Sequence, residues 1–366
     1  GGAFTSIAGT SRIRLARINA DTSLDASFDT SVNGPTSDAV RALAIDATTG
    51  AIYTGGNFSA FGSTAISVNR VVRLTSTGAL DSSWIASPAV ANAVNALHLQ
   101  SDGKLVVGYS SGLLRLLPTG AEDTSHTAAN KPAGVVSALA VQPLDGKIII
   151  GGSFPLVGCA PRAVIARFNS DLTLDGSPAH TFRRNGRVSS IAHAPGGRIY
   201  IAGWFAHVNG TARNNLARLN ADGTLDSTFD VGSGPSYEVS RVVVQGDGKV
   251  VISGSFATVA GIARPNLARL NPDGTVDLTF NAGAVPSSQA MTPLAGGALL
   301  GGGLRQAQRR RPPAVMRSPD PDCRSGTAPW HRLRWPRFAW TPRRPPWLLR
   351  GRRPASARRS PRCRKA

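Results

Sequence analysis

The chain is poor in the residues that most often carry chemistry or mark a cellular compartment. Its 366 residues include 3 cysteines and 2 methionines. Cys159, Cys323 and Cys363 lie far apart, so they predict neither a disulfide framework nor a metal-ligand cluster, and the redox compartment stays open. No apolar run is long enough to span a bilayer, and neither an initiator methionine nor a signal peptide is present. We therefore expect a fragment without a membrane span, whose true start and targeting signal are missing.

Catalytic and metal-binding motifs are also missing. The histidines show neither metal-ligand spacing nor equivalence between repeats; they are His98, His126, His180, His193, His207 and His331. No nucleophile elbow, H-E-x-x-H helix or phosphate-binding G-x-x-x-x-G-K-[ST] loop occurs. The sequence thus predicts no catalytic, cofactor-binding or metal-binding residues, no cofactor, and a protein that is not an enzyme.

The scarcity of glutamate bears on the fold class. Glu122 and Glu238 are the only glutamates among 21 acidic residues, whereas glycine numbers 40. Asp and Gly favour tight turns and disfavour helix interiors. An all-β fold follows.

The net charge of +20 is concentrated in one segment. Residues 303–366 hold 19 of the 41 basic residues and 2 of the 21 acidic ones, so this segment carries +17 and residues 1–302 carry only +3. A strong positive field would indicate a polyanionic partner. Residues 1–302 lack such a field, and we expect no nucleic acid as a partner of this region.

What the sequence does have is a unit of about 51 residues that recurs six times before residue 303. Its clearest copies read LARLNADGTLDSTFD at residues 216–230 and LARLNPDGTVDLTFN at residues 267–281. Within residues 239–280, four short apolar runs alternate with turn signals such as GDG and PDG. Because such a unit is too small to bury its own apolar face, the units must pack against one another.

In every copy an arginine is followed eight residues later by a carboxylate. Across a three-residue hairpin loop this spacing places the two side chains opposite each other on one side of the sheet. A ring of carboxylates could bind a metal ion or act as acid and base, but a feature shared by all repeats more often serves the repeat itself. We predict one cross-strand ion pair in each unit and number the units 1 to 6 in chain order. The pairs are Arg17 and Asp25, Arg73 and Asp81, Arg115 and Asp123, Arg167 and Asp175, Arg218 and Asp226, and Arg269 and Asp277.

Four short strands in a unit of this length indicate the blades of a β-propeller. Residues 1–28 contain only the second half of a unit, and residues 290–302 contain only the first half. We predict that these halves combine into one composite blade, which gives about six four-stranded blades in a domain of residues 1–302. A β-helix fits less well, because its coils need about half this period or less.

Recurring GGxF, RLNxDGxxD and DGK motifs make residues 1–302 resemble the bacterial delta-60 repeat family of β-propellers. The matching GGxF positions are Gly55-Gly56 with Phe58, Gly151-Gly152 with Phe154, Gly203 with Phe205, and Gly254 with Phe256. Unit 3 departs from the pattern, because only seven residues separate Gly108 from Arg115, against 15 between Gly152 and Arg167. The resemblance implies a propeller within a large secreted or surface-associated bacterial protein, and it implies no particular activity.

Residues 303–366 interrupt the repeat in the middle of a motif. They hold 18 arginines, 11 of the 25 prolines and 4 of the 6 tryptophans. One interpretation is a nucleic-acid-binding arm, whose arginines neutralise phosphates while Trp330, Trp335, Trp340 and Trp347 stack on bases. The other, which we favour because lysine is nearly absent, is a GC-rich gene read out of frame. Under either interpretation we expect this segment to be disordered.

A propeller built from these units has two faces, and the second of them varies from unit to unit. Both hairpin turns of each unit share the first face, whereas the loops after GGxF and the links between units share the second. Binding sites favour variable loops on a rigid scaffold, so the second face is where we expect a ligand. Its candidate residues, each of which could also be ordinary solvated loop polarity, are His207, Asn209, Arg213, the segment 177–187 with His180, Arg183 and Arg184, and Tyr237 with Glu238.

Two further sets of recurring residues are interpreted as structural. Asn220, Asp222 and Asp226 vaguely resemble a calcium loop but lack the additional carboxylates needed for six to eight ligands, so we interpret them as turn residues. The recurring aromatics are expected in the core rather than on a binding platform; they are Phe58, Phe154, Phe205 and Phe256.

The sequence favours a non-enzymatic binding or scaffolding propeller module of a larger secreted or cell-surface bacterial protein, with an unknown protein or glycan ligand on the variable face. The enzymatic alternative is a propeller hydrolase or lyase with a site in the central channel, which would need carboxylates or histidines from several units. A second alternative is nucleic-acid binding through the arginine-rich tail. Ligand identity, oligomeric state and the blade number of the full-length protein are left open.

Overall fold

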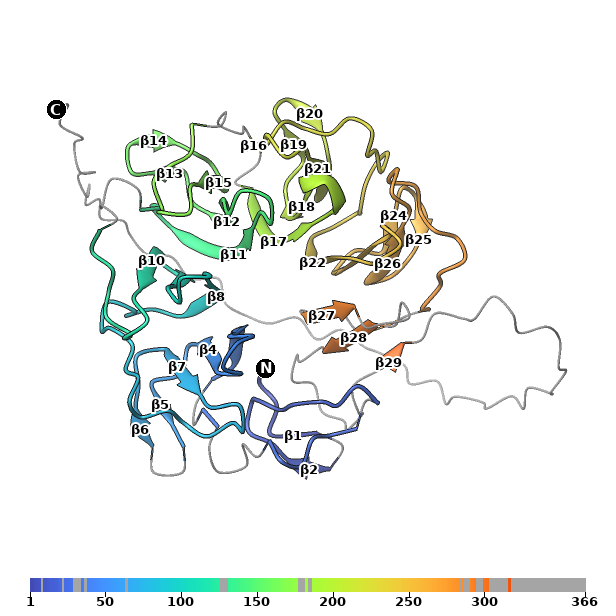
Figure 1. Cartoon of the computed structure of the whole chain (residues 1–366). Coiled ribbons are helices and arrows are strands. Elements are labelled where there is room, and N and C mark those ends of the chain that lie inside the picture. Colours follow the sequence, from blue (N-terminus) through green and yellow to red (C-terminus); the bar gives the residue numbers. More distant parts are fainter. Residues whose placement is uncertain are drawn as a thin grey trace, which may run out of the picture. The chain divides into compact units, whose positions relative to one another are not determined.

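The computed structural model describes residues 1–283 apart from 8, 22, 29–33, 36–37, 63–64, 126–130, 177–181 and 184–185, together with residues 285, 290–293, 299–302 and 315–316. Residues Gly1–Ser318 form one compact unit, and its described part is built from small antiparallel sheets (Figure 1). One turn of 3-10 helix, η2 (Pro195–Gly197), is the helical element among these residues. The all-β prediction is confirmed, and no described helix has the length and hydrophobicity to cross a membrane.

Each full unit forms a three-stranded antiparallel sheet with its second strand in the middle. Units 2 to 6 contain, in order, β3 (Val40–Ile45), β4 (Ile52–Gly56) and β7 (Val71–Leu74); β8 (Val94–Leu99), β9 (Leu105–Tyr109) and β10 (Gly112–Leu116); β11 (Val135–Val141), β12 (Ile148–Ser153) and β15 (Ile165–Phe168); β17 (Arg187–His193), β18 (Ile199–Trp204) and β21 (Leu216–Leu219); and β22 (Val239–Val244), β23 (Val250–Gly254) and β26 (Leu267–Leu270). A further sheet contains β27 (Ala290–Pro293), β28 (Leu299–Gly302) and β29 (Val315–Met316).

The two hairpins of each unit have the predicted registers. In unit 6, Val243 lies opposite Val251 and Val244 lies opposite Val250. The fourth strand of each unit is reduced to one bridged residue, as in the pair Leu219 and Leu225. It is short because the three-residue turn that precedes it, such as Ala221–Gly223, and the link that follows it leave only three or four residues for it.

Small two-residue hairpins follow the GGxF motifs and lie at one end of the sheets. They are β1 (Ser6–Ile7) with β2 (Thr10–Ser11), β5 (Ala60–Phe61) with β6 (Ile66–Ser67), β13 (Leu156–Val157) with β14 (Ala160–Pro161), β19 (His207–Val208) with β20 (Thr211–Ala212), and β24 (Thr258–Val259) with β25 (Ile262–Ala263). In unit 5 the strand β16 (Phe182–Arg183) adds to β19. Unit 3 has no such hairpin, because β9 turns directly into β10 with Tyr109 opposite Gly112, which confirms the predicted loss of a loop.

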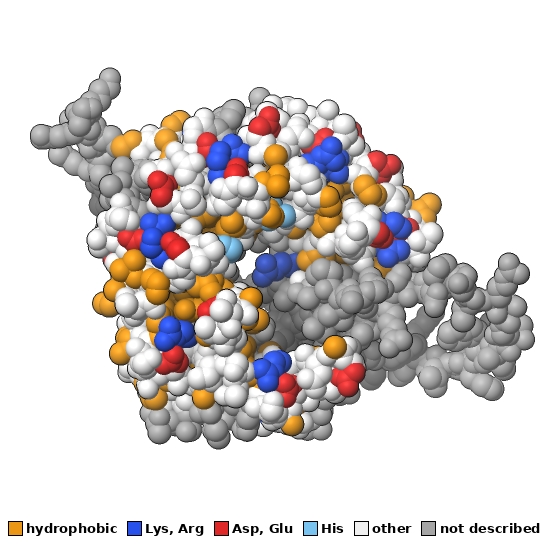
Figure 2. Space-filling model, in the orientation of Figure 1, with side chains coloured by type: hydrophobic (Ala, Val, Ile, Leu, Met, Phe, Trp, Pro, Cys, Tyr) orange, Lys and Arg blue, Asp and Glu red, His pale blue; other side chains and the backbone are white. Residues whose placement is uncertain are grey.

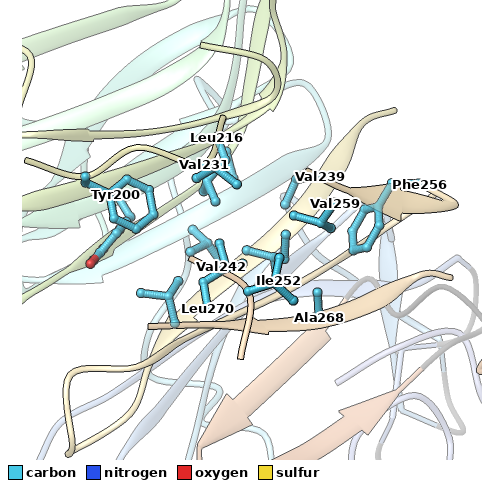
Figure 3. Close-up of a cluster of buried hydrophobic side chains, with 14 residues drawn as sticks. Tyr200, Leu216, Val231, Val239, Val242, Ile252, Phe256, Val259, Ala268 and Leu270 are labelled. Atoms are coloured by element: carbon cyan, nitrogen blue, oxygen red, sulfur yellow. The ribbon is translucent and has the colours of Figure 1, made fainter. Parts of the chain in front are cut away.

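The hydrophobic core lies between successive units. The first strands contact one another in chain order: β3 and β8, β8 and β11, β11 and β17, β17 and β22, and β22 and β27. Figure 3 shows one such interface, where Tyr200 and Leu216 of unit 5 meet Val242 and Ile252 of unit 6. Fully burying a side chain of this size contributes roughly 1.5–3 kcal/mol. The recurring aromatics are buried, as predicted: Phe58, Phe154, Phe205 and Phe256.

The glycines of GGxF fit closely into these interfaces, although Ala202 and Ser253 replace the first glycine in units 5 and 6. A Cβ on Gly151 would lie 2.4 Å from Cγ1 of Val188 in the next unit, and a Cβ on Gly152 would lie 2.0 Å from the carbonyl oxygen of Val135. The first glycine therefore makes room for the next unit's valine, and the second lets the middle strand approach the first. A β-bulge lies beside this contact in each first strand of units 2 to 6.

The N-terminal half-unit packs on unit 2 as a complete unit would. A Cβ on Gly1 would lie 2.3 Å from Cγ1 of Val40, which matches the contact between Gly55 and Val94 in the next pair of units. Leu15 and Phe28 also join the core cluster of unit 2.

The predicted composite pairing between this half-unit and β28 is not formed among the described residues. β28 pairs with β29 instead, so that Leu300 lies opposite Val315, and β29 occupies the edge that residues 15–18 would take. One face of β3 is correspondingly open, since Leu43 is 40% and Ile45 64% exposed. The chain is nevertheless a β-propeller, in which the same kind of interface recurs between successive units. Apart from Val315–Met316 in β29, residues 303–366 lie outside the described residues, so the predictions of a nucleic-acid-binding arm, an out-of-frame segment and disorder cannot be compared with the structure.

Candidate functional site

The periodic arginine–aspartate pairs are formed as the spacing predicted. In all six units the Arg Nε donates to an Asp Oδ2 at 2.6–2.8 Å. The charged groups are half-buried or buried: in unit 5 the Arg218 and Asp226 side chains are only 5% and 4% exposed. Figure 2 shows basic and acidic side chains side by side at successive places on the visible face.

Four of these arginines also link their unit to the next one. Nη1 of Arg218 donates to the carbonyl of Pro272 in the turn of unit 6 at 2.6 Å, and Nη2 donates to the Thr228 hydroxyl at 3.0 Å. The same guanidinium lies over the Phe229 ring, 4.9 Å from its centroid. Equivalent links to the following unit are Arg17 to Ser76, Arg115 to Ser170 and Arg167 to Ala221. The pair is thus a joint between units as well as a staple within one.

The DGK hairpin adds to the same joint. Lys249 lies 2.8 Å from Asp277, and Lys147 lies 3.0 Å from Asp175. Gln142, three residues before the Asp of its DGK turn, donates to the Ala221 carbonyl that Arg167 also contacts. The residues of the DGK motif are therefore accounted for by contacts within the ring of units.

These contacts hold the carboxylates in the ionised form. Burial opposes ionisation of Asp123, but hydrogen bonds from Ser125 and the positive charge of Arg115 outweigh it and lower its pKa to about 2. The pKa of Asp25 is also lowered to about 2, first by the Ser27 hydroxyl and then by Arg17. A carboxyl group with so low a pKa has no proton to donate near pH 7, and its oxygens already accept hydrogen bonds from neighbouring side chains. It is therefore poorly suited to general acid catalysis or metal binding. The structural interpretation of the periodic set is therefore supported.

The residues of the NADG turn behave as turn residues. Asp222 Oδ1 accepts hydrogen bonds from the amide and hydroxyl of Thr224 at 2.8 and 2.7 Å, and Asn220 donates to the same hydroxyl. Among the residues that the structure describes, no three His, Cys, Asp or Glu side chains gather closely enough to hold a metal ion. Cys159 is disulfide-bonded, although the cysteine spacing predicted no disulfide framework.

A second arginine–carboxylate pair breaks the repeat. Arg187 and Glu238 each precede the first buried valine of their unit, in positions that hold Ala39, Ala93 and Val135 elsewhere. Arg187 Nε donates to Glu238 Oε1 at 2.9 Å, and its Nη2 donates to Oε2, so the pair is bidentate. The Arg187 side chain is 53% exposed and that of Glu238 is 15% exposed.

Two aromatic rings lie beside this pair. Trp204, at the end of β18, is the strand partner of Arg187, and Tyr237 directly precedes Glu238. Their ring centroids are 4.4 Å apart with the planes tilted by 57°. Tyr237 is 50% exposed. We call Arg187, Trp204, Tyr237 and Glu238 the rim cluster; it lies between the first strands of units 5 and 6, at the end of the sheets where the GGxF loops begin.

The bulge in each first strand helps to position this cluster. Ser189, the bulged residue of β17, donates to Glu238 Oε1 at 3.0 Å. In unit 3 the bulged Asn95 instead donates to the Val136 carbonyl of unit 4. The bulged residue therefore reaches the next unit in both cases, and between units 5 and 6 it orients the partly buried carboxylate of Glu238.

The structure separates the residues that the sequence placed on the variable face. Tyr237, Glu238 and Arg187 come together in the rim cluster. Arg213 belongs to the repeat, because it donates to the preceding carbonyl just as Arg12 and Arg264 do. His207, whose strand pairs with Arg183, and Asn209 belong to the small hairpin of unit 5. His180 and Arg184 lie outside the described residues.

Trp204 was missed by the sequence analysis. It occupies the variable position of GGxF, where Asn57, Ser153 and Ser255 stand in other units. A search for departures from the repeat, rather than for the repeat itself, would have found it.

Two histidines lie on first strands, His98 on β8 and His193 on β17. Burial lowers the pKa of both imidazoles, and repulsion from His193 in its protonated form lowers the pKa of His98 further. Both ring nitrogens of His193 are buried without a hydrogen-bond partner in the described part of the chain. These imidazoles are therefore held in the neutral form near pH 7.

One family model matches the chain, that of the domain of unknown function (DUF5122) beta-propeller, over residues 1–28, 49–83, 144–177, 195–229 and 245–280. Unit 3, which lacks the small hairpin, is not matched. No curated protein matches the chain.

Among solved structures, the chain is similar to a selenomethionine-substituted virginiamycin B lyase from Staphylococcus aureus, with a TM-score of 0.50 and 14% identity over 74% of this chain and 80% of that one. A catalytically inactive variant of that lyase, solved with quinupristin, has a TM-score of 0.50 and 13% identity over 78% and 80% of the two chains. At these identities the likeness shows the fold alone. Five segments, spread over the repeat region of this chain, thus match the DUF5122 β-propeller repeat.

Proposed function

We propose that this propeller is a binding or scaffolding module of a larger secreted or surface-associated bacterial protein, and that it binds its ligand at the rim cluster between units 5 and 6. One observation carries the proposal. The periodic charged residues make contacts that hold the units together, whereas four residues that depart from the repeat, those of the rim cluster, gather in one place where Arg187 and Tyr237 are half exposed.

The chemistry of the rim cluster suits binding. Arg187 and Glu238 present donors and acceptors in a fixed bidentate geometry, with Ser189 as a further support. Trp204 and Tyr237 add apolar area whose ordering costs little conformational entropy, because aromatic side chains have few rotatable bonds. The family match and the resemblance to delta-60 repeats support a place in an exported parent protein.

The test is a glycan array that includes neutral, amino, sulfated and uronic-acid glycans, probed with the full chain and with two variants. Tyr237→Ala removes an exposed ring of the rim cluster. Ile66→Ala removes a side chain of similar exposure, 48% against 50%, from the small hairpin of unit 2. Binding that is lost only in Tyr237→Ala supports the proposal. Absence of any binding, or equal binding by both variants, contradicts it.

A propeller lyase with a central-channel site is the alternative. Two observations favour it: the solved neighbours are lyases, and the first strands carry His98 and His193, whose neutral imidazoles could accept a proton. Quinupristin incubated with the chain provides a test by mass spectrometry. Conversion of quinupristin by the parent chain but not by His193→Ala would favour the lyase. If quinupristin stays unchanged, it is excluded as a substrate of this chain.

A further inference from the structure

We propose that the rim cluster binds a neutral saccharide, with a sugar ring stacked on Trp204 and Tyr237 and its hydroxyl groups held by Arg187 and Glu238. This inference rests on the proposed function and adds the chemical class of the ligand. The first step in the argument concerns charge, the second the aromatic pair, and the third the openness of the surface.

The charges of the cluster cancel. Glu238 neutralises Arg187 through two hydrogen bonds, so an anionic ligand would have to compete with Glu238 for the guanidinium, and a cationic ligand would have to compete with Arg187 for the carboxylate. A hydroxyl group needs no such exchange, because it can donate to a free carboxylate lone pair and accept from a free guanidinium N–H at once. The pair therefore favours a neutral ligand that is rich in hydroxyl groups.

The aromatic pair adds a requirement for an apolar surface. Trp204 and Tyr237 are in contact, with a tilt of 57° between their rings, and half of Tyr237 is exposed. Such a surface gains free energy by covering the C–H face of a flat, saturated ring. A pyranose combines that face with vicinal hydroxyl groups along its edge. Among common neutral ligands, this combination is characteristic of sugars.

The setting of the cluster favours a chain of sugars over a single one. Arg187 is 53% exposed and Tyr237 50% exposed, so the surface that these residues form is open on at least one side. An open aromatic surface can contact one residue within a polymer without closing around it. The proposal therefore predicts weak binding of monosaccharides and stronger binding of neutral polysaccharides.

The experiment is affinity gel electrophoresis of the full chain through gels containing dextran, laminarin, galactomannan or xyloglucan, with sulfated dextran as an anionic counterpart. The proteins are the parent chain, Trp204→Ala, Tyr237→Ala, Glu238→Gln and the control Ile66→Ala. Circular dichroism shows which variants are folded, and Tyr237→Ala, which alters a half-exposed ring, remains informative if Trp204→Ala does not fold.

We expect at least one neutral polysaccharide to retard the parent chain, and each aromatic substitution to weaken this retardation by about tenfold or more. Ile66→Ala should behave as the parent, and Glu238→Gln should reduce the affinity by a smaller factor. Retardation by none of the neutral polysaccharides, or retardation that survives both aromatic substitutions, overturns the inference. If only sulfated dextran binds, and Tyr237→Ala abolishes that binding, the inference fails while the proposed function stands.

Discussion

Two arginine–carboxylate pairs in this molecule have opposite settings. Arg218 and Asp226 are 5% and 4% exposed, recur in every unit and also contact the next unit. Arg187 and Glu238 are 53% and 15% exposed, occur once and stand beside two aromatic rings. The comparison teaches that periodicity distinguishes two kinds of polar residue in a repeat protein. The pairs that every unit has join the units, and the pair that occurs once is, under the proposed function, part of the ligand site.

The largest expected effect separates the two pairs by stability. Asp226→Ala leaves the buried guanidinium of Arg218 without its partner, so we expect a loss of about 3–5 kcal/mol in the free energy of unfolding. Asp25→Ala is the matched control, because Arg17 and Asp25 are 40% and 17% exposed, and we expect only about 0.2–1 kcal/mol there. Urea denaturation measures both. Equal losses in the two variants would contradict the role of burial.

Acid should act through the periodic set. The pKa of Asp25 and of Asp123 is lowered from 3.8 to about 2, and that of Asp226 is also lowered. A carboxyl whose pKa is lower in the folded state stabilises the fold above its unfolded pKa and loses this contribution as the pH falls. We therefore expect stability to be constant above about pH 4 and to fall steeply toward pH 2. Thermal unfolding followed across this range checks it, and a flat profile would count against the ionised joints.

Substitution of Gly254 is expected to affect both the packing of unit 6 and the rim cluster. A Cβ on Gly254 would lie 2.1 Å from the carbonyl oxygen of Glu238, so Gly254→Ala must displace the strand that carries the rim cluster. We expect a cost of about 1–3 kcal/mol together with weaker ligand binding. Gly246→Ala is the control, because nothing lies within 4 Å of its new Cβ. If Gly254→Ala weakened neither stability nor binding, the close approach of the two strands would not matter.

The smallest expected effect is on the rim pair itself. Glu238→Gln keeps the shape of the side chain and removes its charge. Since the pair is largely solvated on the arginine side, we expect the stability to change by less than about 1 kcal/mol. Thermal unfolding measures the change. A loss as large as that in Asp226→Ala would mean that the pair is a structural joint like the periodic ones.

The sequence predicted the features that the repeat enforces. The eight-residue spacing predicted the ion pairs, the turn signals predicted the hairpin registers, and the short spacing in unit 3 predicted its missing hairpin. These succeed because local pairing follows directly from turn length and side-chain alternation. The contacts between units, such as Arg218 to Pro272, were not predicted, because they join residues 54 positions apart.

The candidate site was predicted only in part. Tyr237 and Glu238 stood out because they lie in a variable link, and Arg187 because it ends another. Their meeting depends on how units 5 and 6 pack, which no local pattern encodes. Trp204 was hidden inside the repeat motif, because it occupies the variable position of GGxF. The predicted strand pairing of the composite blade is wrong for the described residues, because β28 pairs with β29.

The most direct test of the account measures stability and polysaccharide retardation for the same two variants, Asp226→Ala and Tyr237→Ala. The account predicts a crossed result: Asp226→Ala unfolds at a lower temperature and, while folded, is retarded like the parent chain, whereas Tyr237→Ala unfolds like the parent and loses its retardation. Loss of both properties in both variants, or loss of binding in Asp226→Ala alone, would contradict the division between a periodic framework and a single binding rim.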